Sequence, residues 1–82
     1  MSRVLATTER QVEAEARGAY FAELQQRRVV AGEAHIHFWV FEHATENGRF
    51  IEFVEGPDAA ALARAFPTLM PTDVWRAVQG EL

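Results

Sequence analysis

The first third of the chain carries a helical pattern of apolar positions. Apolar side chains recur there at intervals of four residues, at Val12, Ala16, Tyr20 and Leu24. Thr8 and Gln11 have the spacing of a capping box, in which the two side chains satisfy free N–H groups at the start of a helix. The pattern predicts a helix over residues 9–28, preceded by a short strand over residues 3–7.

Two strand-like segments follow, and a turn signal separates them. Residues 35–44 and 49–55 are rich in the aromatic and β-branched side chains that suit strands. Between them, the dipeptide Asn47-Gly48 favours a two-residue hairpin turn, because such a turn needs positive φ at both central positions. The sequence therefore predicts an antiparallel hairpin over residues 35–55.

The last third of the chain contains two further capping signals. Asp58 precedes an alanine-rich stretch that predicts a helix over residues 58–66. Asp73 offers a cap for a final helix over residues 73–79. The predicted order is β-α-β-β-α with a helical C-terminal tail. This order is typical of the α+β class with a ferredoxin-like split βαβ, in a single domain over residues 1–82.

The two-residue turn also determines which side chains share a face of the hairpin. It sets His43 opposite Glu52, whereas a slip by one residue would oppose two like charges. The face predicted to pack against the helices contains Ile36, Phe38, Val40, Ile51 and Phe53. The other face contains His35, His37, Trp39, Phe41, His43, Phe50, Glu52 and Val54. No further element is long enough to cover this second face, so we predict that a second copy of the chain covers it. A half-solvated sheet with scattered aromatic side chains is the alternative.

The composition narrows the class of protein. A chain of 82 residues buries only about 60% of its unfolded surface on folding, so an interface with a second copy would add apolar burial. Eight basic residues against twelve acidic ones give a net charge of −4, which argues against a nucleic-acid partner. The sequence has no cysteine and no apolar run near the roughly 18 residues of a membrane span. It also shows no signal peptide, so we expect a cytoplasmic protein without a membrane partner.

The second face of the hairpin carries the candidates for chemistry. His37 beside Trp39 is the candidate catalytic acid or base, because an imidazole titrates near neutral pH and an aromatic wall keeps a site partly dry. The predicted ligand-binding residues are Tyr20, His35, Trp39, Phe41, Glu52 and Val54. Of these, Trp39 and Phe41 offer flat apolar walls, and Tyr20 would present its hydroxyl to a pocket between helix and sheet. The alternative for His37 and Trp39 is a role in the dimer interface alone.

His35 and His37 also raise the question of a metal. Two imidazoles in i, i+2 positions of a strand lie about 7 Å apart on one face and can share one ion. A catalytic zinc site needs three protein ligands, and the sequence offers no second cluster to complete the set. We therefore predict no metal and no cofactor, with a site at His35 and His37 as the alternative.

One stretch of the sequence resembles a known superfamily. The runs GEAHIHFWVFE (32–42), GRFIEFVE (48–55) and DAAAL (58–62) are similar to the hairpin and second helix of the dimeric α/β-barrel superfamily, above all its antibiotic biosynthesis monooxygenase-like members. The likeness extends over residues 3–66 in element order. It implies two ferredoxin-like protomers with their sheets face to face, and a pocket between each sheet and its helices or within the barrel. Members include cofactor-independent oxygenases, haem-degrading enzymes, isomerases, cyclases and proteins without a known reaction.

The oxygenases of that family commonly carry three residues that this chain lacks. They are an asparagine on the first strand, a tryptophan late on the third strand and a histidine in the helix that follows. Here the first strand has Thr7 and Thr8, the third strand ends Val54-Glu55-Gly56, and residues 58–66 contain no histidine. The final strand of the family is also either missing or replaced by the tail at residues 67–82. The resemblance therefore carries over the fold and not the catalytic residues.

The sequence leads to one predicted function and one alternative. We predict a small homodimeric α/β-barrel protein that binds a small apolar or aromatic molecule in a sheet-face pocket. For such a protein the resemblance implies cofactor-independent oxygenation, isomerisation or cyclisation, and the sequence leaves open whether any reaction is catalysed. The alternative is a non-catalytic interaction or scaffold protein whose aromatic sheet face serves self-association only.

Overall fold

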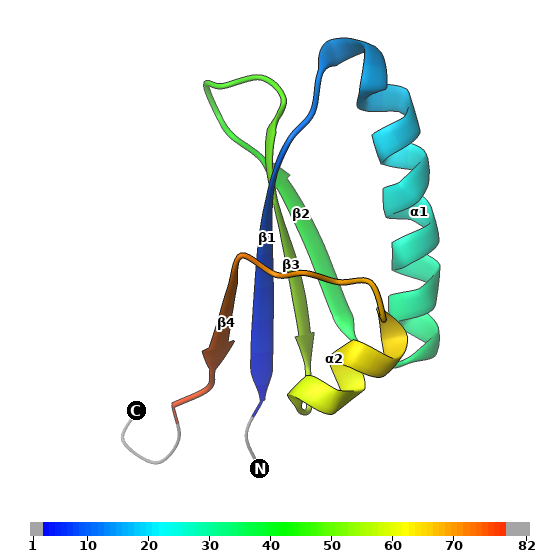
Figure 1. Ribbon diagram of the computed structural model, residues 1–82, viewed down its shortest axis with the longest axis vertical. Helices are drawn as coiled ribbons and strands as arrows, with labels where there is room; N and C mark the ends of the chain where they lie inside the picture. Colours follow the sequence, from blue (N-terminus) through cyan, green and yellow to red (C-terminus); the bar gives the residue numbers. More distant parts are fainter. Residues whose placement is uncertain (1–2, 79–82) are drawn as a thin grey trace.

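In the computed structural model, which describes residues 3–78, four strands form one antiparallel sheet. The strands are β1 (Val4–Gln11), β2 (His37–Glu42), β3 (Arg49–Gly56) and β4 (Asp73–Arg76). Their order across the sheet is β2-β3-β1-β4, so the first strand lies between the third and the fourth (Figure 1). This α+β arrangement is consistent with a ferredoxin-like fold.

Two α-helices complete the described part of the chain. α1 (Arg17–Glu33) follows a single 3₁₀ turn at Ala14–Ala16, and α2 (Ala59–Ala65) follows β3. Asp58 caps α2 as its sequence position predicts, because its carboxylate accepts the N–H of Ala61 at 2.7 Å. Figure 1 shows α1 lying alongside the sheet, and the segment after α2 crossing back over the strands to reach β4.

Both helices pack against the same face of the sheet, and the core lies between them. The buried side chains of this core are Val4, Ala6, Ala31, Ile36, Val54, Leu62 and Phe66. Phe38, Ala65 and Leu69 pack against it from the margin. Because Ala31 belongs to α1 and Leu62 to α2, one apolar cluster holds both helices to the strands.

The first strand is longer, and the first helix starts later, than the capping signal predicts. Residues 9–11 do not begin a helix, as the prediction of residues 9–28 requires, but continue β1 until Gln11 pairs with Arg49. The pairing with β3 extends over all eight residues of β1, and this continuous ladder outweighs a capping box that offers two side-chain bonds. At its other end α1 continues to Glu33, beyond the predicted end at residue 28.

The hairpin has a longer loop than the Asn47-Gly48 signal predicts. The N–H of His43 donates to the carbonyl of Arg49 at 2.7 Å, and residues 43–48 connect the strands. His43 therefore lies beside Arg49 and not opposite Glu52, and β2 is shorter than the predicted strand over residues 35–44. The observed partner of His43, Arg49, is an odd number of residues away from the predicted partner, Glu52. Because side chains alternate between the two faces of a strand, this shift places every β3 side chain on the face opposite to the predicted one.

The faces of the sheet are corrected accordingly. Phe50, Glu52 and Val54 point toward the helices and are buried, whereas the sequence placed them on the second face. Ile51 and Phe53, predicted for the core, share the opposite face with the side chains of Trp39 and Phe41. The β2 side chains are on the faces predicted for them, because an error in register moves only the partner strand.

Gly48 and Glu42 explain the observed loop. Gly48 has φ of +85°, and a Cβ on it would lie 2.5 Å from the carbonyl oxygen of Val12, so only glycine allows this approach to the end of β1. The Val12 N–H donates to the Gly48 carbonyl at 2.8 Å, and the Gly48 N–H donates to Glu42 Oε2 at 2.9 Å. Asn47 and Gly48 do form the centre of a turn, which the Arg49 N–H closes on the Glu46 carbonyl at 3.3 Å, but Asn47 has no positive φ and the strands pair in another register than the two-residue hairpin predicts.

The C-terminal segment is a strand and not the predicted helix over residues 73–79. β4 pairs with β1 along its length, with Leu5 opposite Trp75, and the N–H of Thr72 donates to the carbonyl of Thr7 at 2.7 Å. The outer edge of β1 offers backbone groups that need partners, and a helix of this length is marginal by itself. The last residue of the predicted helix lies outside the described residues.

Glu42 gives the fold a predicted pH dependence. Arg17 donates to both carboxylate oxygens of Glu42, at 2.8 and 2.7 Å, and these bonds together with the Gly48 N–H lower the pKa of Glu42 from 4.5 to about 2. Below pH 4.5 the unfolded chain takes up a proton at this position and the folded chain does not. The stabilisation is therefore complete above pH 4.5 and is lost as the pH falls toward 2.

Thermal unfolding of a Glu42→Gln variant tests this dependence. Between pH 4.5 and pH 2 the melting temperature of the wild-type chain is expected to fall more steeply than that of the variant. Glu13→Gln is the matched control, because Glu13 is exposed and its side chain makes no capping bond. Parallel curves for the wild type and Glu42→Gln would show that the Arg17–Glu42 pair does not contribute.

Candidate functional site

A buried carboxylate lies between α1 and the sheet. Glu52 is 1% exposed, and both of its carboxylate oxygens face donors. The Tyr20 hydroxyl donates to Oε2 at 2.6 Å, and Arg27 Nη1 donates to Oε1 at 3.0 Å. Arg10 Nη1 lies 3.8 Å from Oε2. We call Tyr20, Arg27, Glu52 and Arg10 the buried polar cluster.

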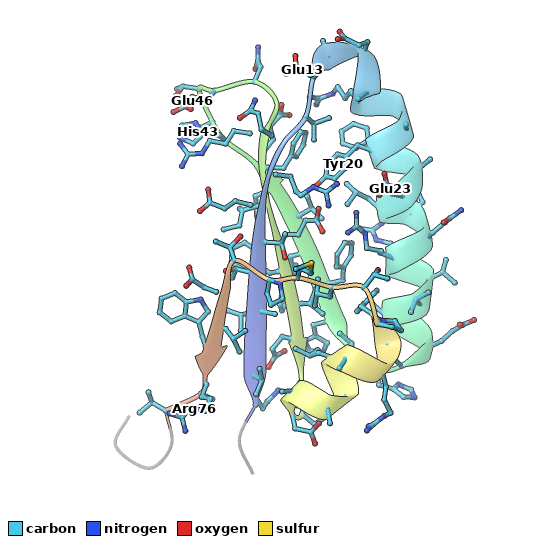
Figure 2. The ribbon with its side chains drawn as sticks, viewed as in Figure 1. Glu13, Tyr20, Glu23, His43, Glu46 and Arg76 are labelled. Atoms are coloured by element: carbon cyan, nitrogen blue, oxygen red, sulfur yellow. The ribbon has the colours of Figure 1, made fainter. Side chains whose placement is uncertain are left out.

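Local structure explains why these four side chains meet. Tyr20 and Arg27 are seven residues apart on α1, which places them on one face of the helix, two turns apart. Glu52 and Arg10 point to the same face from the neighbouring strands β3 and β1. Figure 2 shows Tyr20 on the side of α1 that faces the sheet.

Tyr20 serves this cluster as a hydrogen-bond donor. Burial, followed by its bond to Glu52, raises the pKa of Tyr20 well above its ordinary value, so the phenol keeps its proton at any ordinary pH. Its ring packs on Phe50 with centroids 4.9 Å apart, and the guanidinium of Arg10 lies over the ring at 5.4 Å. A protonated, fixed phenol can orient the carboxylate of Glu52.

A cleft of about 690 Å³ opens next to the buried polar cluster. It lies between α1, β1 and the segment 65–72, and we call it the helix–sheet cleft. Its apolar walls come from Val30, Phe66, Leu69 and Met70, and its polar atoms include those of Thr8, Arg10 and Arg27. Glu23, which Figure 2 labels on the same helix as Tyr20, also lines it.

The other face of the sheet carries no helix in the described part of the chain. We call this side of the sheet the open face, and its apolar side chains are Leu5, Trp39, Phe41, Ile51, Phe53 and Trp75. Trp39 is 46% exposed, Phe41 58% and Trp75 57%. A second hollow of about 440 Å³ lies between the two tryptophans, with Arg3 and Glu55 at its margin.

The structure divides the predicted site residues between the two faces. Tyr20 and Glu52 meet in the buried polar cluster, and Val54 belongs to the core. His37, Trp39 and Phe41 lie on the open face, so the sheet separates them from Tyr20 and Glu52. The pairing of Glu52 and Val54 with the aromatic face, which the sequence predicted, is wrong because it followed from the wrong register.

Of the two histidines of the predicted site, His37 begins β2 and His35 lies before the strand. His37 places Nδ1 3.1 Å from Glu55 Oε1, and its ring meets Trp39 edge-on with centroids 5.5 Å apart. His35 has φ of +57° in the turn after α1. Within residues 3–78 no group of three or more histidine, aspartate or glutamate side chains is placed to hold a metal ion.

Arg10 and Arg27 were not predicted as site residues. Arg27 follows Tyr20 by seven residues and continues the same helical stripe, a spacing that the sequence does contain. Arg10 could be found only by extending the first strand to Gln11, because it then alternates with Val4 and Ala6 on the helix side. The capping box at Thr8 instead predicted that the strand ends at residue 7 and that a helix begins at residue 9.

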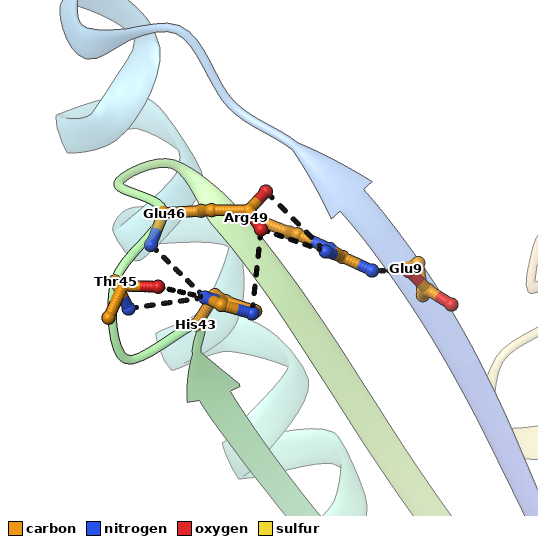
Figure 3. A network of polar contacts seen from close by, with 5 residues as sticks. All are labelled: Glu9, His43, Thr45, Glu46 and Arg49. Carbon is orange, nitrogen blue, oxygen red and sulfur yellow. Dashed lines mark hydrogen bonds and ion pairs between the residues drawn. The ribbon is translucent and has the colours of Figure 1, made fainter.

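A second polar network holds the 43–48 loop and involves none of the four residues of the buried polar cluster (Figure 3). The Nδ1 atom of His43 accepts the N–H groups of Thr45 and Glu46, both at 3.1 Å. Arg49 then links the Glu46 carboxylate, at 3.3 Å, to Glu9 on β1, at 3.6 Å. The network fixes the loop to the end of β1, so His43 has a structural role.

Comparison of the chain with protein-family models, with curated proteins and with solved structures gives no match. The similarity to the antibiotic biosynthesis monooxygenase-like family therefore remains a resemblance. Among the helices of residues 3–78, none is long and apolar enough to cross a membrane. The class that the fold and site define is a small α+β protein with a helix–sheet cleft on one face and an uncovered aromatic face on the other.

Proposed function

We propose that the chain forms a homodimer through its open face and that each protomer binds a small, largely apolar molecule in the helix–sheet cleft. The cleft is the observation that carries the binding function. Its volume of about 690 Å³ lies within the range of roughly 300–1,000 Å³ typical of small-molecule sites. Apolar walls with a few polar atoms at one end are the usual lining of such sites.

The open face supports self-association. Three of its large aromatic side chains are about half exposed, and they adjoin Ile51, Phe53 and Leu5 in one surface. Contiguous apolar surfaces of this kind mark interfaces more often than scattered apolar residues do. A short chain also gains the apolar burial that its own core cannot supply.

The charges around the open face favour a second copy as the occupant. Arg3 pairs with Glu55 at one end, and Arg49 lies 3.6 Å from Glu9 at the other. Each end therefore carries both signs, so a two-fold arrangement can bring opposite charges together at every margin. A partner with a strongly basic or strongly acidic surface would not meet a complementary charge along this face.

The finer architecture follows from the same proposal. The strand order β2-β3-β1-β4 is the order of a ferredoxin-like sheet, and two such sheets packed through their open faces would lie about 10 Å apart. This assembly is the dimeric α/β barrel that the resemblance implies. The helices and the helix–sheet clefts would remain on the outside of the barrel.

A reaction is not assigned to the cleft. His37, the candidate acid or base, lies on the opposite side of the sheet from the cleft of its own protomer. Its partners Glu55 and Trp39 belong to the open face, so proton transfer by His37 would require a second ligand site inside the barrel. If His37 catalysed oxygenation, isomerisation or cyclisation, the substrate would have to bind inside the barrel and not in the helix–sheet cleft.

The alternative function, self-association without a ligand, rests on the open face alone. It predicts that the helix–sheet cleft stays empty with every small molecule tested. Binding and self-association occupy opposite faces of the sheet, so they can be tested separately.

A cleft-filling variant tests the binding function. Neutral probes such as 1-naphthol and 1-octanol are expected to shift the amide NMR signals of Thr8, Val30 and Leu69 in the wild-type chain. Val30→Trp is expected to weaken binding by about tenfold or more, because the indole would occupy the cleft volume that Val30 borders.

Val29→Trp is the matched control, because Val29 precedes Val30 on α1, is 60% exposed and does not line the cleft. It should bind the probes as the wild type does. Signals that shift at Trp39 and Trp75 instead would place the ligand on the open face and contradict the cleft. No shift with any probe would favour the self-association function.

A further inference from the structure

We infer that the helix–sheet cleft selects small carboxylic acids with an apolar body, and that Arg10 binds the carboxylate. The inference rests on the proposed binding function and names the class of ligand. It depends on a difference between the two arginines of the cleft.

Arg27 is already engaged by carboxylates. Its Nη1 donates to Glu52 at 3.0 Å, and its Nη2 lies 3.5 Å from Glu23. Nη2 is buried and makes no hydrogen bond within the described residues. Arg27 is thus held in place by α1 and β3, with little freedom to follow a ligand.

Arg10 has a charge without a hydrogen-bonded partner in the described part of the chain. Glu52 is the only residue there whose carboxylate comes within 4 Å of the Arg10 guanidinium, with Oε2 at 3.8 Å, and that oxygen accepts the Tyr20 hydroxyl at 2.6 Å. A guanidinium carries five N–H donors, and none of those on Arg10 has an acceptor among these residues. The side chain is 38% exposed and lines the cleft, so its donors can reach a ligand.

The ring of Tyr20 fixes the position of Arg10. The guanidinium lies 5.4 Å from the ring centroid, a cation–π distance, and the ring itself is held by Phe50 and by the bond to Glu52. The Glu52 carboxylate already occupies the buried side of the cluster, so a carboxylate of a ligand cannot bind there. A ligand acid would therefore approach Arg10 from the cleft side.

The shape of the cleft supplies the rest of the ligand class. Arg10 lies on β1, and apolar side chains from α1 and from the segment after α2 form the opposite walls, among them Val30, Leu69 and Met70. An acid bound at Arg10 would extend an aromatic or aliphatic body along these walls. Arginine suits this task because its planar fork matches both carboxylate oxygens.

Matched pairs of acids and amides test the inference on the wild-type chain. Phenylacetate with phenylacetamide, 4-phenylbutyrate with 4-phenylbutanamide, and octanoate with octanamide differ in charge but hardly in shape. At neutral pH each acid is expected to bind about tenfold or more tightly than its amide, by NMR or calorimetric titration. Arg10→Met should remove this preference, so that each acid binds no more tightly than its amide.

Arg28→Met is the control, because Arg28 is exposed on α1 and does not line the helix–sheet cleft. It should keep the preference for acids. Amides that bind in the cleft as tightly as acids would overturn the inference and leave the binding function intact. A preference that survives Arg10→Met would also overturn it, and binding by neither class would overturn both the inference and the binding function.

Discussion

Replacing Glu52 by alanine is expected to cost about 3–5 kcal/mol of folding free energy. The carboxylate is 1% exposed and accepts hydrogen bonds from both Tyr20 and Arg27, while Arg10 stands 3.8 Å away. Its removal would leave a phenol and a largely buried guanidinium without their acceptor. A small domain has only about 5–15 kcal/mol of stability in total, so the variant should retain little of it.

Urea unfolding followed by circular dichroism measures this loss. Glu23→Ala is the matched control, because Glu23 also approaches Arg27 but is 58% exposed, and its removal is expected to change stability by about 0.5 kcal/mol or less. If Glu52→Ala does not fold, Tyr20→Phe gives a measurable intermediate loss of about 1–3 kcal/mol. A Glu52→Ala variant within about 1 kcal/mol of the wild type would contradict the buried polar cluster.

Replacing Phe41 by glutamate is expected to convert the dimer into a folded monomer. Phe41 is 58% exposed in one protomer and meets Phe53 edge-on with centroids 5.7 Å apart, so the protomer loses little when the ring is removed. In the proposed dimer, two symmetry-related glutamates would be buried against apolar side chains of the open face. The dissociation constant should rise by about a hundredfold or more.

Analytical ultracentrifugation of Phe41→Glu measures this change, with circular dichroism as the test of folding. The control is Val29→Glu, which adds the same charge to an equally exposed apolar position on α1, on the other side of the sheet. It should assemble as the wild type does. If Phe41→Glu keeps the wild-type mass, the open face is not the interface.

The local signals in the sequence predicted those parts of the fold that depend on neighbouring residues. The structure confirms the predicted cap at Asp58 at the start of α2, and the two aromatic segments form β2 and β3. The strand register depends on contacts between distant segments, namely Arg17 with Glu42 and Gly48 with Val12. The Asn47-Gly48 signal is strong for a free hairpin, and these contacts overrode it.

The error in register had a direct effect on the site. Glu52 and Tyr20 were both named from the sequence, but on different surfaces, and only the correct face of β3 brings them together at 2.6 Å. The same reversal exchanges Phe50 for Phe53 on the open face. The sequence predicted an uncovered aromatic face. It could not predict which β3 side chains lie on that face, because a register error of an odd number of residues moves every side chain of the strand to the other face.

The C-terminal strand shows a second limit of local patterns. Asp73 has the position of a helix cap, but residues 73–76 complete the sheet because β1 offers an unpaired edge there. Trp75 reaches the open face only through this pairing, opposite Leu5. Its place beside Trp39 at a common hollow could not be predicted without the strand.

Sedimentation equilibrium of the wild-type chain tests the central claim, that the uncovered sheet face joins two copies. Across micromolar concentrations the predicted mass is about twice the 9.3 kDa of one chain. A single species of 9.3 kDa throughout that range would contradict the homodimer, and with it the assignment of the open face.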